Sequence, residues 1–502
     1  MAAALPALER AAQGAKVGAV LDFLRRSPTK LLIDGKWTAA KSGKTFETIN
    51  PANEEVLALV AEGDKADVDE AVVAARRAFE EGRWRTITPH QRGRYLLRIA
   101  ELIDKYADEL AELESLDNGK PVAQARTIDI AGAAGIFRYF AGWPSKIYGE
   151  TNPSDPGMFN YTLREPIGVC GLIIPWNFPL MMAVTKIAPA LACGNTMILK
   201  PAEQTPLTAI RLGELLQEAG IPDGVVNIIT GFGPGAGSAI AEHPGIDKVA
   251  FTGSTEVGKL ILQASAGNLK RVSLELGGKS PNIVFPDADL ASAVKNAMTG
   301  VFYNSGQVCA AGTRIFVQRD IYDNFVADLT AASERMTPGN PLDPQTRLGP
   351  VVSREQFDRV LGYVTAGRHE GARVTIGGEA VGGKGYYVKP TIFADVRNDM
   401  KIAQEEIFGP VAAAIPFKDE DDAVLQGNAT TYGLAAAVWS RDIRRAHRVA
   451  RALKAGTVWV NCYGVTDTAM PFGGYKQSGF GREGSRHVID LFTQIKSVYV
   501  KL

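Results

Sequence analysis

The sequence contains few cysteines, no excess of either charge and no long apolar run. Its four cysteines, in 502 residues, form no C-x-x-C pair and have no metal-like spacing with the five histidines. We therefore expect neither a disulfide framework nor a bound metal, and we expect a reducing, cytoplasmic setting. Lysine plus arginine number 55, as do aspartate plus glutamate, so net charge gives no argument for a nucleic-acid or anionic-membrane partner. Without a run of about 18 apolar residues, no transmembrane helix is predicted.

The N-terminal stretch lacks the features of a targeting signal. "MAAALPALERAAQGAKVGAVLDFLRR", residues 1–26, is alanine-rich and helical in pattern. Charged residues such as Glu9, Lys16 and Asp22 interrupt it, which argues against a secretory signal. Because transit peptides are poor in acidic residues, Glu9 and Asp22 also argue against an organellar address. We expect an N-terminal helix followed by short antiparallel strands.

What the chain does contain is a regular alternation of strands and helices. From Lys65 to about Arg138 the pattern is helical, with Asp64 as a predicted N-cap. Between residues 168 and 276 apolar strands alternate with helices through short connections, which predicts a parallel sheet covered by helices. Such sheets bind ligands at the carboxyl ends of their strands. A second run of strands and helices continues to about residue 480, so we predict an α/β protein with more than one domain.

The C-terminal stretch "TQIKSVYVKL", residues 493–502, reads as a strand with no obvious partner nearby. A strand of this kind has unpaired backbone groups along both edges. We therefore expect it to join another sheet, such as that of a second subunit.

Three stretches at successive strand ends are candidates for a nucleotide site. "GFGPGA", residues 231–236, is a G-x-G-x-x-A pattern after a strand, although glycines there are usually just a turn. Gly253 ends a strand and Ser254 opens a helix, which suits a pyrophosphate or a plain N-cap equally. Lys200 and Glu203 follow a third strand, where a carboxylate could bind a ribose diol. Together on one sheet, the three make a nucleotide site more probable than any one alone.

Three further residues are candidates for catalysis, and each also has a purely structural interpretation. Asn177 in "PWNFP" is rigidly presented and could donate to an oxyanion or merely satisfy a turn. Glu275 in "LELGGKSPNIV" is either a structurally paired carboxylate or a general base with a raised pKa. Cys309, between the small residues of "SGQVCAAG", is a core thiol or a nucleophile. All three fall at element ends beside the predicted nucleotide site.

In this arrangement the chain resembles the NAD(P)-dependent aldehyde dehydrogenase superfamily, in its hydrolytic, non-phosphorylating branch. The resemblance rests on the order of "PWNFP", "KPAEQTP", "FTGSTEVG", "LELGGKSPNIV", "GQVCAAGTR", "EEIFGP" and "PFGGYKQSG", and it covers the chain from about residue 31 to the C-terminus. It implies a Rossmann-like nucleotide domain, an α/β catalytic domain and a small β hairpin for oligomerisation. The implied boundaries are 1–147 with 168–276, then 277–485, and 148–167 with 486–502, respectively.

The resemblance also implies a role for each candidate. Cys309 is the nucleophile, Glu275 the general base, and Asn177 the oxyanion donor together with the Cys309 backbone N–H. Lys186 and Glu483 form an internal relay through which the proton leaves. An aldehyde, NAD and water would then give the acid through a thiohemiacetal and a thioester on the cysteine.

The cofactor implied is NAD, because Glu203 would repel the 2′-phosphate of NADP, while Lys200 leaves some use of NADP open. In this family the "FTGSTEVG" helix binds phosphate and the "GFGPG" loop lies near the adenine, which demotes the G-x-G-x-x-A match. The implied cofactor residues are Ile174, Pro175, Trp176, Lys200, Glu203, Gly233, Gly253, Ser254, Leu276, Glu406 and Phe408. Of these, Glu406 and Phe408 hold the nicotinamide ribose.

The resemblance finally bears on substrate and partners. Acetaldehyde-oxidising relatives carry a tryptophan where this chain has Thr185, so we expect a wider apolar tunnel and a medium-chain aliphatic or aromatic aldehyde. The expected tunnel residues are Phe178, Met182, Thr185 and Phe472. We expect a homo-oligomer, dimer or tetramer. An inactive relative would lack the nucleophile or the base, and a CoA-acylating one would lack the glutamate, whereas Cys309 and Glu275 are both present.

Overall fold

A computed structural model describes residues 5–502, so the first four residues of the expected N-terminal helix lie outside the described part. The helical pattern of this region forms two short helices, α1 (Leu5–Ala11) and α2 (Gly18–Leu24). They are followed by the β1–β2 hairpin (Leu31–Ile33 and Lys36–Thr38) and the separate β3–β4 pair (Thr45–Asn50 and Glu55–Ala61). The predicted short antiparallel strands are therefore confirmed.

The predicted parallel sheet is the centre of an eight-stranded sheet with the order β18-β10-β9-β6-β7-β8-β1-β2. Its parallel strands are β6 (Val169–Ile173), β7 (Thr196–Lys200), β8 (Val226–Ile228), β9 (Lys248–Thr252) and β10 (Arg271–Glu275). Antiparallel strands close both sides: β1 beside β8, and β18 (Gly479–Phe480) beside β10. The sequence-based boundary places residues 479–480 in the second domain, but their backbone pairs with the first sheet.

The helices around this sheet begin and end at recognisable signals. Asp64 caps α3 (Lys65–Glu80) with a capping box, as predicted. The long helical stretch after it divides at Tyr106 into α5 (Pro89–Lys105) and α6 (Ala107–Asn118), and Gly119 ends it with φ of 85°. The other helices are α4 (Arg83–Thr86), α7 (Val122–Gln124), α8 (Ala131–Ala141), α9 (Pro179–Cys193), α10 (Leu207–Glu218), α11 (Ser238–Glu242) and α12 (Thr255–Ala264).

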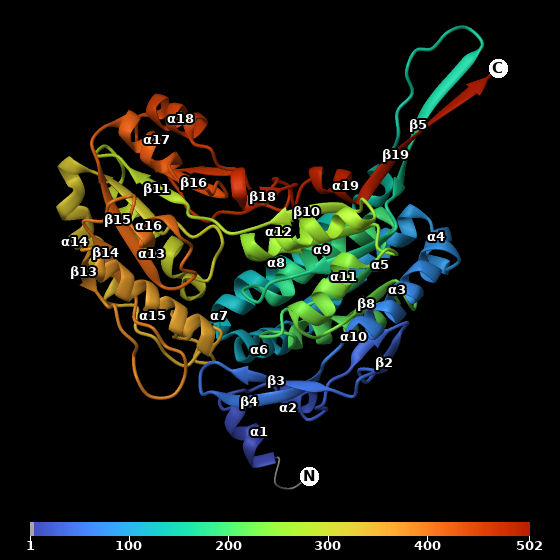
Figure 1. Ribbon diagram of the computed structural model, residues 1–502, viewed down its shortest axis with the longest axis horizontal. Helices are drawn as coiled ribbons and strands as arrows, with labels where there is room; N and C mark the ends of the chain where they lie inside the picture. The colour runs from blue at the N-terminus through green and yellow to red at the C-terminus, as the bar shows by residue number, and fades with distance from the viewer. Residues whose placement is uncertain (1–4) are drawn as a thin grey trace.

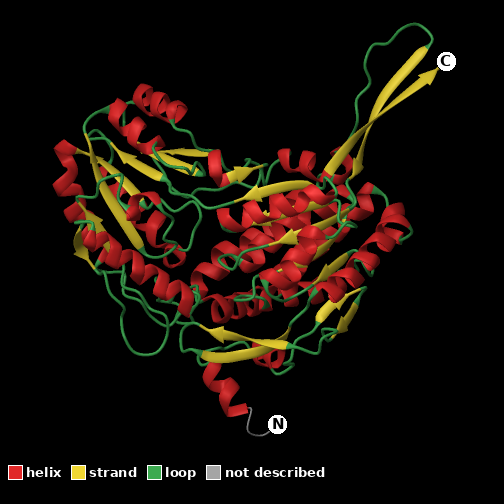
Figure 2. Cartoon of the chain, in the orientation of Figure 1, coloured by secondary structure: helices red, strands yellow, loops and turns green. Residues whose placement is uncertain are grey.

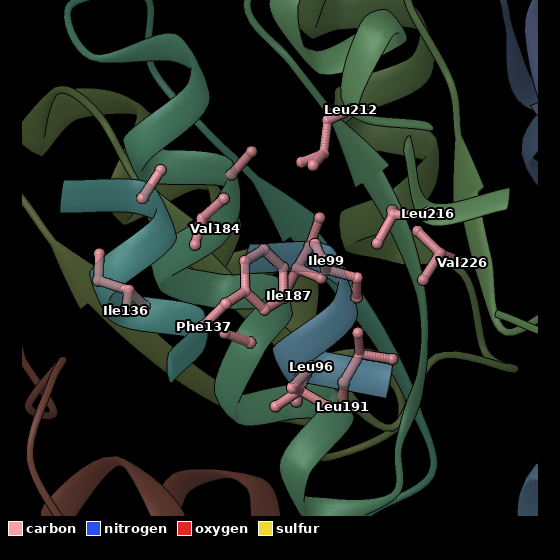
Figure 3. Close-up of a cluster of buried hydrophobic side chains, with 14 of the residues drawn as sticks. Leu96, Ile99, Ile136, Phe137, Val184, Ile187, Leu191, Leu212, Leu216 and Val226 are labelled. Atoms are coloured by element: carbon pink, nitrogen blue, oxygen red, sulfur yellow. The ribbon is translucent and has the colours of Figure 1, made fainter. Parts of the chain in front are cut away.

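One face of the sheet packs on α5, α8, α9 and α10 through a continuous apolar core. Figure 3 shows Leu96 and Ile99 of α5 facing Phe137 of α8 and Ile187 of α9, with Leu212 nearby. All five side chains are fully buried. Burying a side chain of this size contributes about 1.5–3 kcal/mol. The core therefore fixes α9, whose N-terminal end carries the Asn177 loop.

A second sheet, from later in the chain, lies beside the first (Figures 1 and 2). Its order is β13-β14-β15-β12-β11-β16-β17, parallel except for β13. The strands are β11 (Pro281–Val284), β12 (Arg314–Gln318), β13 (Arg373–Ile376), β14 (Thr391–Ala394), β15 (Val411–Phe417), β16 (Ala435–Trp439) and β17 (Thr457–Val460). Its helices are α13 (Leu290–Phe302), α14 (Tyr322–Ser333), α15 (Arg354–His369), α16 (Lys401–Gln404), α17 (Glu420–Asn428) and α18 (Ile443–Ala452).

The C-terminal strand pairs with a strand distant in the sequence, as expected, but that strand belongs to its own chain. After α19 (His487–Phe492), β19 (Thr493–Lys501) pairs antiparallel with β5 (Met158–Pro166) from Thr493↔Pro166 to Lys501↔Met158. Local sequence could not reveal this partner because the two strands are more than 300 residues apart. Within residues 148–167 the expected hairpin is reduced to β5 and one bridge, Thr151↔Tyr161. Figure 1 shows the β5–β19 ribbon projecting from the body. Over residues 5–502, no helix combines the length and apolarity needed to cross a membrane.

Candidate active site

The predicted cofactor residues lie at one edge of the first sheet. Strands β10, β9, β6 and β7 are parallel neighbours, so their carboxyl ends share that edge. Residues 174–176 follow β6, Lys200 ends β7, Gly253 and Ser254 follow β9, and Leu276 follows β10. This edge is where open parallel sheets bind their ligands. The fold therefore brings the residues of the predicted nucleotide site together in space.

The turn before Cys309 is held in an uncommon backbone conformation. Asn304 and Ser305 have φ of 48° and 55°, and Gly306 has φ of 75°. A Cβ on Gly306 would come within 2.0 Å of the Gly409 carbonyl oxygen, so only glycine fits there. Left-handed conformations at residues other than glycine persist where surrounding contacts enforce them, often at functional sites. The turn is therefore fixed by packing against the 406–410 loop, and it presents Cys309 at its end.

Asn177 is tied to this turn by reciprocal hydrogen bonds. Its Nδ2 donates to the Gln307 carbonyl at 2.9 Å, and Asn304 Nδ2 donates to the Asn177 carbonyl at 2.8 Å. Gln307 is itself fully buried, and its Oε1 accepts from the Val352 N–H at 2.9 Å. The amide of Asn177, 2 % exposed, is thus held beside the residues that precede Cys309. One of its two N–H groups serves Gln307, which leaves the other for a ligand.

Cys309 combines a reachable thiol with surroundings that disfavour a thiolate. The residue is only partly buried. Burial of its surroundings raises the pKa of the Cys309 thiol to about 12, the carboxylates of Glu406 and Glu275 add to the rise, and the Ala310 N–H opposes it. Gly278 packs against the same segment, since a Cβ there would lie 2.4 Å from the Cys309 carbonyl oxygen. The thiol therefore needs a base before it can act as a nucleophile.

Glu275 ends β10 in a buried position with an unengaged oxygen. The residue is 5 % exposed, and within residues 5–502 no hydrogen-bond partner engages its Oε2. Burial raises the pKa of Glu275 well above its usual value, and the Glu483 carboxylate adds to the rise, while Lys186 opposes it. A Cβ on Gly473 would lie 2.7 Å from Glu275 Oε1, so that glycine makes room for the carboxyl group. A buried carboxyl of this kind suits proton transfer.

Lys186 and Glu483 form an ion pair next to Glu275. Lys186 Nζ donates to Glu483 and also to Thr252 Oγ1, the latter at 2.7 Å. The lysine side chain is 1 % exposed, and that of the glutamate is 13 % exposed. Both groups act on the pKa of Glu275. The two residues that the resemblance assigns to a relay are therefore in contact.

The groups expected around the adenosine fit a nucleotide. Lys200 Nζ lies 3.2 Å from Glu203 Oε2, and the Glu203 side chain stays 30 % exposed, so its carboxylate is available to ribose hydroxyls. Ser254 caps α12 by accepting from the Val257 N–H at 3.2 Å, and the first N–H groups of α12 remain for an anion.

Packing requires only one of the two glycines in the G-x-G-x-x-A match. Gly231 is required for packing, because its Cβ would lie 2.5 Å from the Gly63 carbonyl oxygen. At Gly233, which opens the short π-helix Gly233–Gly237, a Cβ would meet open space. The first glycine of the pattern therefore has a structural reason that involves no ligand, which agrees with the demotion of this match.

Glu406 and Phe408 bring two side chains from the second half of the chain to the binding edge of the first sheet. Glu406 Oε1 accepts from the Gly278 N–H at 3.0 Å, and burial raises the pKa of Glu406 to about 7. The Phe408 ring meets that of Trp176 edge-on, with centroids 5.1 Å apart. The "EEIFGP" loop thus touches the first sheet's binding edge although it belongs to the second half of the chain.

The expected tunnel residues lie on or near the start of α9. Phe178 stacks on Tyr303 with ring centroids 6.1 Å apart, while Lys120 Nζ lies 4.1 Å from the Phe178 centroid. Met182 and Thr185 follow on α9 and are partly exposed, whereas Phe472 joins the apolar cluster that contains Cys309. Sequence reasoning missed Tyr303 and Lys120. An aromatic residue six positions before the cysteine was the signal for the former, and nothing local marked the latter.

Comparisons with known proteins agree with this geometry. The sequence model of the aldehyde dehydrogenase family matches residues 37–498. The chain is similar to an aldehyde dehydrogenase of Aspergillus niger, 54% identical over 476 residues that cover 95% of each chain. Among solved structures, it is similar to the NAD+ complex of a Bacillus cereus aldehyde dehydrogenase, with TM-score 0.96, 50% identity, and coverage of 97% and 99%. It is also similar to a mutant P. syringae indole-3-acetaldehyde dehydrogenase in complex with NAD+ and IAA, with TM-score 0.94, 45% identity and 99% coverage of each chain.

Proposed function

The chain belongs to the aldehyde dehydrogenase family, and on that premise we propose that it oxidises its aldehyde through a covalent intermediate on Cys309. It is an NAD(P)-dependent aldehyde dehydrogenase, and NAD is its cofactor. The observation that carries the covalent route is the hydrogen bond from Asn177 to Gln307, two residues before Cys309. It holds an amide donor beside the residues that lead to the partly exposed thiol of Cys309.

In the first step the Cys309 sulfur bonds to the aldehyde carbon as the thiol proton passes to a base. Because burial and two carboxylates raise the pKa of the thiol to about 12, a free thiolate is scarce at neutral pH. Glu275 supplies the base, since its Oε2 has no partner among residues 5–502. The carbonyl oxygen becomes an oxyanion, which accepts from the second N–H of Asn177 and from the Cys309 N–H. One such donor is typically worth about 2.7–4 kcal/mol.

The oxyanion then collapses to a thioester as hydride leaves the carbon. NAD, when bound, accepts that hydride. Lys200, Glu203 and Ser254 hold its adenosine end and phosphates in this proposal, and Glu406 with Phe408 holds the nicotinamide ribose. The fit rests on the partly exposed Glu203 carboxylate and on the N–H groups at the start of α12.

In the last step Glu275 takes a proton from water, and the hydroxide attacks the thioester. The carbon–sulfur bond breaks, the acid leaves, and Cys309 regains a proton. Glu275 must have released its earlier proton first. The Glu483 carboxylate, paired with Lys186, lies where it can receive that proton.

The substrate we propose is a medium-chain aliphatic or aromatic aldehyde. Thr185 leaves room in the tunnel, and the rings of Phe178 and Tyr303 stack along its wall. Each methylene buried there contributes about 0.8 kcal/mol. The similarity to an indole-3-acetaldehyde dehydrogenase supports the aromatic part of this proposal.

The test separates acylation from hydrolysis. Cys309→Ala removes the nucleophile, so NADH formation is expected to fall by at least about a thousandfold. Glu275→Gln removes the base of both steps, so NADH formation in a single turnover is expected to slow strongly, and the acyl-enzyme that does form is expected to stall at the thioester. The stalled thioester is measured as an added acyl mass on the protein. Full steady-state turnover in Glu275→Gln contradicts the role of the carboxylate.

A further inference from the structure

Helix α6 is buried on all sides although its sequence, "ADELAELESLDN", is rich in acidic residues. Glu109, Glu112, Glu114 and Asp117 are all buried, and the last two are fully so. A buried carboxylate is costly unless charges or hydrogen bonds compensate it. None of these residues belongs to the site described above. Their partners therefore indicate what they contribute.

Three helices around α6 begin without a side-chain cap of their own. The N-cap residues of α2, α9 and α10 are Val17, Phe178 and Pro206, which have no side-chain acceptor. The first backbone N–H groups of a helix need acceptors. Carboxylates of α6 supply them for α9 and α10, and a third carboxylate of α6 accepts from the two residues that directly precede α2.

The acceptors come from three successive acidic residues of α6. Glu112 accepts from the N–H groups of Lys16 and Val17 at 3.0 and 2.9 Å, before α2. Glu114 Oε2 accepts from the Leu180 N–H at 3.2 Å, in the first turn of α9. Asp117 Oδ2 accepts from the Leu207 N–H at 2.9 Å, at the start of α10.

Two of these helices directly follow the loops of the active site. The loop before α9 carries Asn177, and the loop before α10 carries Glu203. Asn118, at the end of α6, adds a direct contact by donating from Nδ2 to the Trp176 carbonyl at 2.8 Å. One rigid, buried helix therefore holds the ends of both loops.

We propose that α6 positions both loops, with Glu114 acting on the oxyanion donor Asn177 and Asp117 acting on the ribose contact Glu203. Glu114 and Asp117 are positioning residues, since neither touches the reacting atoms. The inference rests on the proposed function, because it takes from there the roles of Asn177 and Glu203.

Glu114 and Asp117 differ in whether the corresponding amide side chain can keep all of their hydrogen bonds. Glu114 serves two donors, Leu180 N–H and Lys120 Nζ, the latter at 3.3 Å through Oε1. A glutamine has one oxygen, so one donor loses its acceptor. Asp117 serves the Leu207 N–H and the Thr48 hydroxyl, the latter at 2.7 Å. A hydroxyl can also accept, so an asparagine there satisfies both. Burial also raises the pKa of Asp117 to about 7, in keeping with tolerance of a neutral group.

The first experiment compares Glu114→Gln with Glu112→Gln. Both replace a two-donor acceptor on the same helix, but Glu112 caps α2, which carries no site residue. Glu114→Gln is expected to lower kcat roughly tenfold with the KM for NAD changed less than about twofold, because a misplaced donor weakens the transition state. Glu112→Gln is expected to lower Tm comparably and to leave both constants unchanged. Equal kinetic effects of the two variants overturn the proposal for Glu114.

The second experiment uses the conservative variant as a rescue. Asp117→Ala is expected to raise the KM for NAD about fivefold with kcat within about twofold, because it frees the loop of Glu203. Asp117→Asn is expected to restore the KM for NAD to nearly the wild-type value. Identical behaviour of the two variants, or a loss confined to Tm, overturns the proposal for Asp117.

Two controls keep the outcome decisive. The first control applies if Glu114→Gln does not fold. Asn118→Ala then removes a neutral donor to the same loop, and its kcat is expected to fall several-fold. An unchanged kcat in Asn118→Ala counts against the proposal.

Asn177→Ala tests the proposed function separately. If Asn177→Ala keeps full kcat, the oxyanion role fails; if it loses kcat while Glu114→Gln keeps it, only the positioning role fails.

Discussion

Glu275 is held where its charged form is unfavourable, which links its chemistry to the stability of the protein. Burial and the Glu483 carboxylate raise its pKa well above the usual value of about 4.3. The folded state therefore binds a proton that the unfolded state releases. By linkage, stability is complete below the unfolded pKa and falls as the pH rises through the folded pKa. A residue suited to proton transfer thus lowers stability at the pH where it works.

This sign gives a prediction for Glu275→Gln. The amide cannot ionise, so the variant is expected to gain stability relative to wild type as the pH rises, with a Tm advantage of about 2 °C or more at alkaline pH. Thermal unfolding from about pH 5 to about pH 9 measures the difference. Glu165→Gln, on the exposed ribbon, serves as the control and is expected to follow wild type. A Tm difference for Glu275→Gln that shrinks with rising pH contradicts the raised pKa.

Glu203 gives a second prediction at this scale, on the choice between NAD and NADP. Its carboxylate is 30 % exposed and lies 3.2 Å from Lys200 Nζ. Repulsion between this carboxylate and a 2′-phosphate about 4 Å away in water would be worth about 1 kcal/mol. Glu203→Gln is therefore expected to narrow the preference for NAD roughly fivefold to tenfold, measured as the ratio of kcat/KM for the two cofactors. A wild-type preference for NADP contradicts this assignment.

At the scale of the element, α9 joins several parts of the site on one rigid body. Its buried face packs on α5, α8 and α10 (Figure 3). Phe178 precedes its first turn, Thr185 lies partly exposed in the middle, and Lys186 points the other way into the ion pair with Glu483. Thr185 also donates from Oγ1 to the Met181 carbonyl at 2.8 Å, which keeps the hydroxyl on the helix. In the proposed function, this one helix therefore sets both the width of the substrate tunnel and the geometry of the relay.

Thr185→Trp tests the tunnel. The indole is expected to lower kcat/KM for phenylacetaldehyde and hexanal by at least about tenfold and to spare acetaldehyde, because it fills the space that the longer chains occupy. A panel of aldehydes of rising length, followed by NADH formation, measures the change. Thr185→Val keeps the volume and is the matched control. An unaltered order of preference in Thr185→Trp shows that the tunnel is limited elsewhere.

At the scale of the whole molecule, the β5–β19 ribbon stands away from the body (Figure 1). Direct pairs such as Leu163↔Lys496 and Phe159↔Val500 place their side chains on one face. On that face Phe159, Leu163 and Val500 are exposed, and on the other face Ile495 and Tyr499 are exposed. A two-stranded ribbon is marginal alone in water, and exposed apolar patches mark interaction sites. Its position agrees with the predicted role in oligomerisation.

A new charge among the exposed apolar side chains of the ribbon is expected to weaken self-association. Leu163→Lys is expected to shift the molecular mass in solution toward that of the monomer, with an effect of at least about tenfold on the dissociation constant. Light scattering after size-exclusion chromatography measures it. Asp358→Lys, at an exposed position of α15 outside the ribbon, is the control. If wild type is itself a monomer at micromolar concentration, the oligomerisation prediction fails.

The sequence alone determined the family and the fold class, and it supplied the candidate residues of the site. Short-range patterns carried this information: apolar strands alternating with helices between residues 168 and 276, and motifs such as "PWNFP" and "GQVCAAGTR" whose order is specific. Cys309, Glu275 and Asn177 could be selected because each follows or precedes an element whose end is visible locally.

Only the tertiary structure decided which distant segments meet. β19 pairs with β5 across more than 300 residues, and Gly479–Phe480 joins the first sheet rather than the second. Glu114 caps a helix 66 residues further along the chain. The "DELAELESLDN" pattern shows acidic residues that usually face water, and only packing shows that they are buried under helix ends. The physical reason is that periodicity and turn chemistry act within a few residues, whereas hydrogen-bond partners and buried charges are assigned by the packing of the whole chain.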